Sequence, residues 1–218
     1  KSKLNKSLSE NSIVVQGMGN VGFNFIKSVY QMCPLVKIIG IIEKNGSIYD
    51  SSGIDLNKFI KKYEKYKNIE KINFKGFSKK NSIESFPSDI LIPSAIENVI
   101  NKKNVNKIKV KLILEAANGP ITYNADEILT KKGITIIPDI YVNAGGVIVS
   151  YFEWVQGLQN FFWDLDQINS KLYSILKESF DNVTTCHETY KVDMKQAAFI
   201  AALQRLANAM RVRGLFPA

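Results

Sequence analysis

The sequence predicts an α/β fold, in which a doubly wound, mostly parallel sheet is followed by a helical appendage at the C-terminus. Short apolar runs alternate with amphipathic helical patterns as far as residue 137. A glycine-rich turn joins the first apolar run to the first helical pattern, and strand-like runs end before residue 147. With 218 residues, 45% of them apolar, the chain is long enough to bury a sizeable core.

Strands and helices alternate through the first part of the chain. We predict strands at Ser12–Gln16, Val36–Ile42, Asp89–Ile92, Lys111–Glu115 and Ile134–Ile137. Helical patterns begin at Val21 and cover Asp55–Tyr66 and Ala125–Lys132. Pro34 closes the first helix and Pro93 stops the third strand, because proline lacks the backbone N–H that both structures use. Strands that are separated by helices favour parallel pairing.

The remainder of the chain is predicted to be helical, with helices at Val149–Phe162, Ile168–His187 and Met194–Arg213. Gly214 takes the capping position of the last helix, whose apolar stripe consists of Ile200, Leu203, Ala207 and Met210. Aromatic residues of the first of these helices are expected in its core: Tyr151, Phe152 and Trp154.

The net charge of +9 raises the question of a nucleic-acid partner. In the second predicted helix, lysines fall at helical spacings beside apolar residues, which describes a solvated lysine face over an apolar face. The lysines are Lys58, Lys61, Lys62 and Lys65, and the apolar residues are Phe59, Ile60 and Tyr63. Because lysine is abundant along the whole chain, we expect no nucleic-acid partner.

Cellular location is constrained by what the sequence lacks. No apolar run approaches the roughly 18 residues that cross a bilayer, and the opening residues lack the features of a signal peptide. Cys33 and Cys186 are too few and too far apart to suggest a disulfide framework or a zinc site, so we expect core thiols and no metal. We expect a cytoplasmic protein without a membrane partner, and the mitochondrial matrix stays open as an alternative.

A six-residue motif joins the first predicted strand to the first helix: Gly17, Met18, Gly19, Asn20, Val21 and Gly22. Between a strand and a helix, this pattern indicates a dinucleotide-binding turn of the Rossmann-like kind. Gly17 allows the tight turn, Gly19 lets the backbone approach a pyrophosphate, and Gly22 lets the helix pack closely on the strand. The start of the helix offers N–H groups to the phosphates. A glycine-rich turn that binds no ligand is the alternative.

Glu43 ends the second predicted strand, 21 residues after Gly22. We expect a carboxylate at this place to hydrogen-bond the adenine ribose and to repel a 2′-phosphate, which favours NAD as the cofactor. Lys44 lies beside it and is able to neutralise such a phosphate, so NADP or dual use stays open.

Four stretches of the sequence, in order, resemble the cofactor-binding half of glutamate dehydrogenases of the hexameric type, in the family of glutamate, leucine, phenylalanine and valine dehydrogenases. They read QGMGNVG, EKNGSIYDSSGID, LEAANGP and PDIYVNAGGVIVSYFEW. The resemblance extends from Ser12 through the C-terminal helix. With it, we expect residues 1–142 to form the dinucleotide-binding core and residues 143–218 to complete the same dehydrogenase domain, with the N-terminal substrate domain absent.

The resemblance also implies ligand contacts. Ser94 and Ala95 would lie along the adenosine side of the cofactor, Asn118 would face the ribose on the nicotinamide side, and Asn143 would approach the nicotinamide. Ser150, in VSYFEW, corresponds to the serine that helps to bind the side-chain carboxylate of glutamate, and relatives that act on leucine, phenylalanine or valine are not similar in this stretch. The commoner roles of these residue types are a turn former for Asn118, a helix N-cap for Asn143 and a surface hydroxyl for Ser150.

The reaction that the resemblance implies is oxidative deamination of L-glutamate to 2-oxoglutarate and ammonia, and its reverse. Such chemistry needs a base and a cation near the substrate α-carbon. In glutamate dehydrogenases these are a lysine and an aspartate of the substrate domain, and this sequence has no matching stretch, so we assign no catalytic residue. The complete enzyme is expected to form a homohexamer. A leucine, phenylalanine or valine dehydrogenase, or a non-catalytic nucleotide-binding module, is the alternative.

Overall fold

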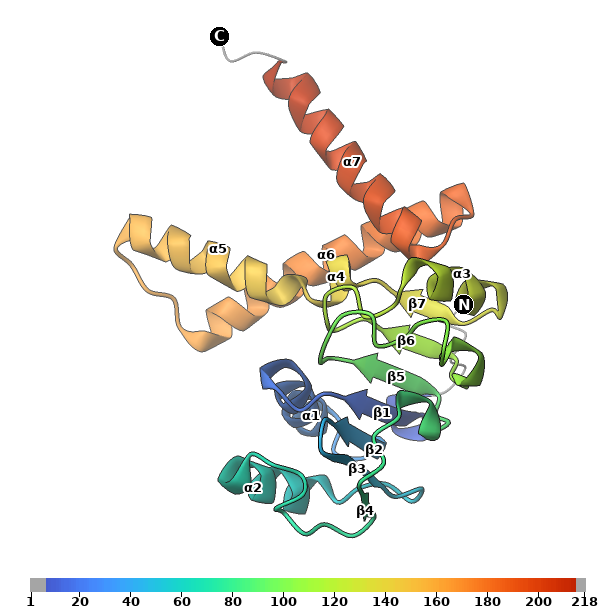
Figure 1. Cartoon of the computed structure of the whole chain (residues 1–218). Coiled ribbons are helices and arrows are strands. Elements are labelled where there is room, and N and C mark those ends of the chain that lie inside the picture. Colours follow the sequence, from blue (N-terminus) through green and yellow to red (C-terminus); the bar gives the residue numbers. More distant parts are fainter. Residues whose placement is uncertain (1–6, 215–218) are drawn as a thin grey trace. The chain divides into compact units, whose positions relative to one another are not determined.

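The computed structural model describes residues 7–214 and divides between Ile136 and Ile137 into two compact units (Figure 1). The first unit contains nearly all of the sheet together with the helices that cover it, and the second unit consists mainly of helices. Among the described residues, no helix combines the length and the apolar character that crossing a membrane requires.

The sheet has the strand order β4-β3-β2-β1-β5-β6-β7. Its strands are β1 (Ser12–Gln16), β2 (Lys37–Glu43), β3 (Gly46–Tyr49), β4 (Phe77–Ser78), β5 (Ile90–Pro93), β6 (Leu112–Leu114) and β7 (Thr135–Ile137). β1 pairs in parallel with β2 on one side and with β5 on the other, and β5 pairs in parallel with β6. β3 and β4 extend the sheet beyond β2 as antiparallel strands. The order of the strands therefore reverses between β1 and β5.

Helical elements cover both faces of this sheet. They are η1 (Leu8–Glu10), α1 (Asn20–Met32), α2 (Leu56–Tyr66), η2 (Ile83–Ser85), η3 (Val105–Lys107) and α3 (Tyr123–Lys131). α1 and α2 pack on one face, and α3 packs on the other with η2 and η3. Successive strand residues point to opposite faces, so Ile13 and Val15 join the first layer and Val14 joins the second. Burial on both faces explains why these strands read as continuous apolar runs.

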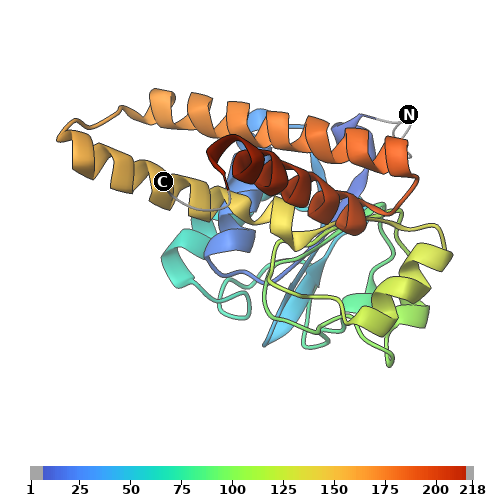
Figure 2. The same cartoon turned by 90° about the horizontal axis from the view of Figure 1, so that it is seen from above.

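The described part of the second unit folds into α4 (Asp139–Val142), α5 (Ala144–Gln159), α6 (Leu165–Tyr190) and α7 (Met194–Arg213). α6 lies beside both α5 and α7 (Figure 2). Asp164 and Asp193 begin α6 and α7 as N-caps, because each side chain accepts a hydrogen bond from a backbone N–H of the first turn. A small core joins α6 to α7 and consists of Val183, Cys186, Met194, Ala197 and Ala198.

The structure confirms the α/β class and the predicted alternation of strands and helices. Each predicted strand lies within one residue of its expected bounds. The prediction omits the antiparallel strands β3 and β4. Asn45 stands directly before β3 and Gly46 is its first residue; because this dipeptide is typical of turns, the sequence does carry a signal for the β2–β3 hairpin. β4 has only two residues and carries no such signal.

The prediction for α5 is shifted along the chain. The helix begins at Ala144 rather than Val149, and it ends at Gln159 rather than Phe162. Two glycines follow Ala144 inside the helix. Because glycine is a weak helix former, the sequence pattern pointed to a later start.

The expectation of buried aromatic residues on α5 is wrong for two residues of the three. Phe152 is buried, whereas Tyr151 and Trp154 are 57% and 60% exposed in the described structure. The prediction for α2 is confirmed, because Phe59 and Tyr63 are buried while three of the four lysines are exposed.

The apolar stripe predicted on α7 is partly buried only at Ile200, and its other three residues are exposed. Leu203 is 63% exposed and Met210 is 44% exposed, whereas Ala197 and Ala198 near the start of the helix are buried. Gly214 takes the C-cap position, as predicted. α7 therefore packs against α6 mainly through its first turns.

Candidate functional site

The glycine-rich turn lies at the edge of the sheet where the strand order reverses. Gly17 follows the last residue of β1, and Ser94 and Ala95 follow the last residue of β5. These strand ends are neighbours, since Gln16 pairs with Pro93. In an open α/β sheet, such a switch point leaves a crevice outside the carboxyl ends of the strands, and ligands bind there.

Gly17 makes the tight turn. Its φ of 96° lies in the region that favours glycine, and a Cβ at this position would lie 2.7 Å from the Cβ of Ala95. Its N–H donates to the carbonyl of Ile42 at 2.7 Å. The Ser94 hydroxyl donates to the carbonyls of Gly17 and Gln16 at 3.1 and 2.8 Å. Ser94 is buried, so its side chain supports the turn.

Met18 is held on both sides of its backbone. Its N–H donates to Oε2 of Glu43 at 2.9 Å, and its carbonyl accepts a hydrogen bond from the Tyr63 hydroxyl at 2.7 Å. Oε1 of Glu43 accepts a hydrogen bond from the N–H of Lys44 at 2.9 Å. A carboxylate has about four acceptor positions, so Glu43 retains capacity for further donors such as ribose hydroxyls.

Burial raises the pKa of Tyr63, and the negative charge of Glu43 raises it further. The hydroxyl therefore stays protonated and able to donate. From the sequence, Tyr63 belongs only to the apolar face of a helix. Its bond to Met18 spans 45 positions of the chain, so no local pattern indicates its place beside the turn.

The other two glycines of the motif differ sharply in their surroundings. A Cβ at Gly22 would lie 2.0 Å from the carbonyl oxygen of Gly17 and 2.6 Å from Oγ of Ser94, so only glycine allows this close contact of helix and turn. A Cβ at Gly19 would meet no atom within 4 Å. Gly19 is the N-cap of α1 and has no side chain to cap the helix, and Asn20 and Val21 after it are exposed. Helix N-termini of this kind attract anions.

Asn118 lies in the loop that follows β6, at the same edge of the sheet. The N–H groups of Ala116 and Ala117 donate to the carbonyl of Pro93 at 3.1 and 2.9 Å, which ties this loop to the end of β5. Asn118 is exposed, and Gly119 after it has a φ of 51°. The first unit thus brings most predicted cofactor positions to one edge of the sheet.

Asn143 and Ser150 belong to the second unit. Asn143 stands between α4 and α5, and its N–H donates to the carbonyl of Asp139 at 3.0 Å. It takes the N-cap position of α5, but its side chain makes no capping hydrogen bond. Ser150 is exposed on α5, seven positions further on. Positions seven apart lie on the same face of a helix.

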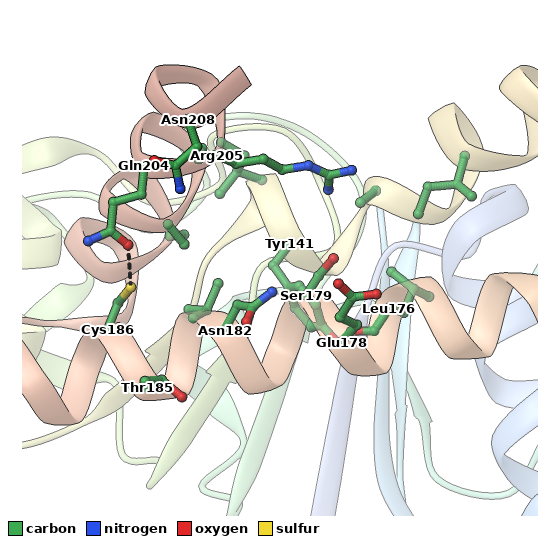
Figure 3. A pocket seen from close by; sticks show the side chains of 17 residues that line it. Tyr141, Leu176, Glu178, Ser179, Asn182, Thr185, Cys186, Gln204, Arg205 and Asn208 are labelled. Atoms are coloured by element: carbon green, nitrogen blue, oxygen red, sulfur yellow. Dashed lines mark hydrogen bonds between the residues drawn. The ribbon is translucent and has the colours of Figure 1, made fainter. Parts of the chain in front are cut away.

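A groove of about 620 Å³ lies within the second unit among α4, α5, α6 and α7 (Figure 3). Polar groups from α6 and α7 line it, among them Asn182, Arg205 and Asn208. Neither Asn143 nor Ser150 belongs to its lining, so this groove does not coincide with the predicted ligand positions.

The metal-binding potential of the described residues and the surroundings of the histidine limit the chemistry of this part of the chain. Over residues 7–214, no cluster of three or more histidine, cysteine or carboxylate side chains is placed to hold a metal ion. The single histidine, His187, hydrogen-bonds the carbonyl of Val192. The site at the sheet edge consists of backbone amides, one carboxylate and small residues, which are groups that bind phosphates and hydroxyls.

Residues 1–214 match the model of the Glutamate/Leucine/Phenylalanine/Valine dehydrogenase family. The chain is 42% identical over 207 residues to a glutamate dehydrogenase of Thermotoga maritima, across 94% of this chain and 49% of that protein. It is 37% identical over 210 residues to an NAD-specific glutamate dehydrogenase of Staphylococcus aureus, across 96% of this chain and 50% of that protein. The crystal structure of the glutamate dehydrogenase from Peptoniphilus asaccharolyticus superposes with a TM-score of 0.77 at 31% identity, across 94% of this chain and 47% of that chain.

The chain spans about half the length of the curated relatives it matches. These findings confirm the resemblance that the four sequence stretches carry, and they agree with the α/β fold. The family model covers nearly every residue of the chain, and it includes the glycine-rich turn, Asn143 and Ser150. The chain belongs to the glutamate/leucine/phenylalanine/valine dehydrogenase family.

Proposed function

We propose that this chain is the NAD-binding portion of a glutamate dehydrogenase. The observation that carries the proposal is the glycine-rich turn at the switch point of the sheet, with the Glu43 carboxylate bonded to it. The similarity to two glutamate dehydrogenases supports glutamate as the substrate of the complete enzyme. On this proposal, residues 1–142 form the dinucleotide-binding core and residues 143–218 complete the same domain.

The turn has the properties that a pyrophosphate requires. The space beside Gly19 is open, and α1 begins there without a capping side chain. The pyrophosphate would therefore lie against the turn formed by Gly17, Met18, Gly19, Asn20, Val21 and Gly22, and Glu43 would hold the adenine ribose. The other residues proposed to lie along the cofactor are Lys44, Ser94, Ala95, Asn118 and Asn143.

We infer a preference for NAD over NADP. The Glu43 carboxylate lies at the end of β2, where it would repel a 2′-phosphate. The relative from Staphylococcus aureus is named NAD-specific, which supports the same choice. Lys44, beside Glu43, is exposed and is the residue through which NADP use would arise.

The proposed reaction of the complete enzyme is oxidative deamination of L-glutamate with water, which gives 2-oxoglutarate and ammonia. The cofactor, when bound, accepts the hydride from the α-carbon. Ser150 would bind the side-chain carboxylate of the substrate. We assign the base and the cation to a substrate domain outside these residues, so this chain should bind the cofactor without turning over glutamate. Domain closure would bring substrate and nicotinamide together.

We further propose that the complete enzyme is a homohexamer in the cytoplasm, with the mitochondrial matrix as the alternative compartment. The resemblance to hexameric glutamate dehydrogenases supports this assembly. Nucleic acid and membrane have no part in the proposed function.

Calorimetric titration of this chain with NADH and NADPH, at one ionic strength, tests the proposal. We expect NADH to bind more tightly than NADPH. Gly19→Val should abolish NADH binding, because the valine side chain would occupy the open space beside the turn. Circular dichroism should show an unchanged fold, since the new side chain meets no protein atom at its Cβ.

Gly157→Val is the matched control. Gly157 lies in α5, and a Cβ there also meets no atom within 4 Å, so the same change outside the glycine-rich motif should leave NADH affinity intact. A folded wild-type chain that binds neither cofactor would refute the proposal. Tighter binding of NADPH would overturn the preference for NAD alone.

A further inference from the structure

We propose that Tyr63 is a positioning residue for the cofactor, because its hydroxyl orients the peptide between Met18 and Gly19 so that the Gly19 N–H faces the pyrophosphate. The inference deepens the proposed NAD-binding function and rests on it. Tyr63 lies on α2, outside the glycine-rich motif, and its hydroxyl reaches the Met18 carbonyl at 2.7 Å.

The backbone hydrogen bonds of residues 17–19 single out one group. Among the three N–H groups and three carbonyls of this segment, only the Gly19 N–H has no hydrogen-bond partner within residues 7–214. Gly19 is also exposed, whereas Gly17 and Met18 are buried. The partners of the other five groups are Ile42, Ser94, Glu43, Tyr63 and Phe23.

The Gly19 N–H and the Met18 carbonyl belong to the same peptide unit. A peptide unit is planar, and no described peptide bond is cis, so the N–H and the C=O point in opposite directions. The bond from Tyr63 fixes the carbonyl on one side and thereby directs the N–H to the other. Rotation of this peptide would break the Tyr63 bond, so the hydroxyl stabilises one orientation of the donor.

Tyr63 is itself held firmly. Its ring packs against Phe23 with centroids 4.9 Å apart and against Phe59 at 5.6 Å. Tyr63 is 5% exposed, so its hydroxyl has little access to water and needs a protein partner. Glu43 holds the N–H of the same Met18 residue, so the two side chains together fix both peptide units that meet at Met18.

Tyr63→Phe tests this role, since it removes the hydroxyl and keeps the ring packing. Loss of one neutral hydrogen bond should weaken the binding of NADH and ADP-ribose about fivefold. Binding of adenosine, which lacks the pyrophosphate, should not change. In ¹⁵N-glycine-labelled protein, the shift of the Gly19 amide signal upon NADH addition should be smaller in the variant than in the wild type. Tyr49→Phe is the control, because the Tyr49 ring is stacked on Phe86 and its hydroxyl makes no hydrogen bond in the described chain.

The outcomes separate the two proposals. If the wild type binds NADH and Tyr63→Phe retains both its affinity and its Gly19 shift, the positioning role is wrong and the NAD-binding function stands. Equal weakening for NADH and adenosine would also overturn the positioning role, because it would reveal a general structural effect. A folded wild type that binds no NADH would refute the NAD-binding function, and the role of Tyr63 with it.

Discussion

Replacing Gly22 with alanine should destabilise the fold, whereas the same change at Gly19 should mainly affect binding. A Cβ at Gly22 would lie 2.0 Å from the Gly17 carbonyl oxygen and 2.6 Å from Oγ of Ser94. The Gly17 backbone cannot move away easily, because its N–H is bonded to Ile42 and its carbonyl accepts the Ser94 hydroxyl. The start of α1 must therefore shift to accommodate the methyl group.

The magnitude follows from two opposing effects. Overpacking of a well-filled interior costs about 1–3 kcal/mol, and a contact this short belongs at the upper end. Alanine is the better helix former by about 1 kcal/mol, which offsets part of that cost. We expect Gly22→Ala to lower the free energy of unfolding by about 2 kcal/mol. At Gly19 the φ is −71° and the Cβ meets no atom, so Gly19→Ala should cost less than about 1 kcal/mol.

Urea unfolding followed by circular dichroism measures both variants, and NADH titration measures their affinity. The m-value should stay constant while the midpoint of Gly22→Ala falls. Gly19→Ala should lower the midpoint less than Gly22→Ala does and should lose NADH affinity. A Gly22→Ala protein with the stability and the NADH affinity of the wild type would refute the reasoning, since the close contact of helix and turn would then be dispensable.

Three further changes probe other parts of the chain. Asp89→Asn should lower the free energy of unfolding at pH 7 by about 2 kcal/mol, because the folded chain stabilises the Asp89 carboxylate. Burial acts to raise the pKa of Asp89, but a hydrogen bond and charge from Lys111, together with hydrogen bonds from Ser12, outweigh burial and hold the pKa at about 2. That stabilisation is present above pH 3.8 and disappears as the pH falls through 2. In urea unfolding, the difference in the free energy of unfolding between the wild type and Asp89→Asn should therefore shrink as the pH is lowered to 2. Glu43→Gln should improve the binding of NADPH relative to NADH about fivefold, because it removes a charge worth about 1 kcal/mol near the 2′-phosphate; an unchanged calorimetric ratio would contradict this. Trp154→Ala should change the free energy of unfolding of this chain by less than about 0.5 kcal/mol, because Trp154 is 60% exposed; a loss above 2 kcal/mol would mean that the indole is buried.

The spacing of apolar and capping residues along the sequence predicts most of the helices and strands. The strands read as apolar runs because both faces of the sheet are covered, and α2 begins at Asp55, whose side chain accepts a hydrogen bond from the Lys58 N–H. Two elements depart from the local pattern of the sequence. β4 is a strand because it pairs with β3, which is a contact between separate segments of the chain. α5 continues through two glycines, which are weak helix formers and therefore disfavour a helix in the local pattern.

In the candidate site, too, the sequence indicates some of the residues and only the structure identifies the others. The spacing of Gly17, Gly19 and Gly22 and the carboxylate of Glu43 were evident from the sequence, because a tight turn, an open approach and a close helix contact each demand a particular residue type at a fixed place. No local pattern indicates that the Tyr63 hydroxyl donates to the Met18 carbonyl.

The sequence by itself therefore determined the alternation of strands and helices, the glycine-rich turn and the family. Only the tertiary structure decided which distant side chains support that turn. Ser94 reaches Gly17 across 77 positions of the chain, and Tyr63 reaches Met18 across 45. The physical reason is that periodicity and turn chemistry encode which face of an element is buried, whereas the partner that meets this face depends on how the whole chain packs.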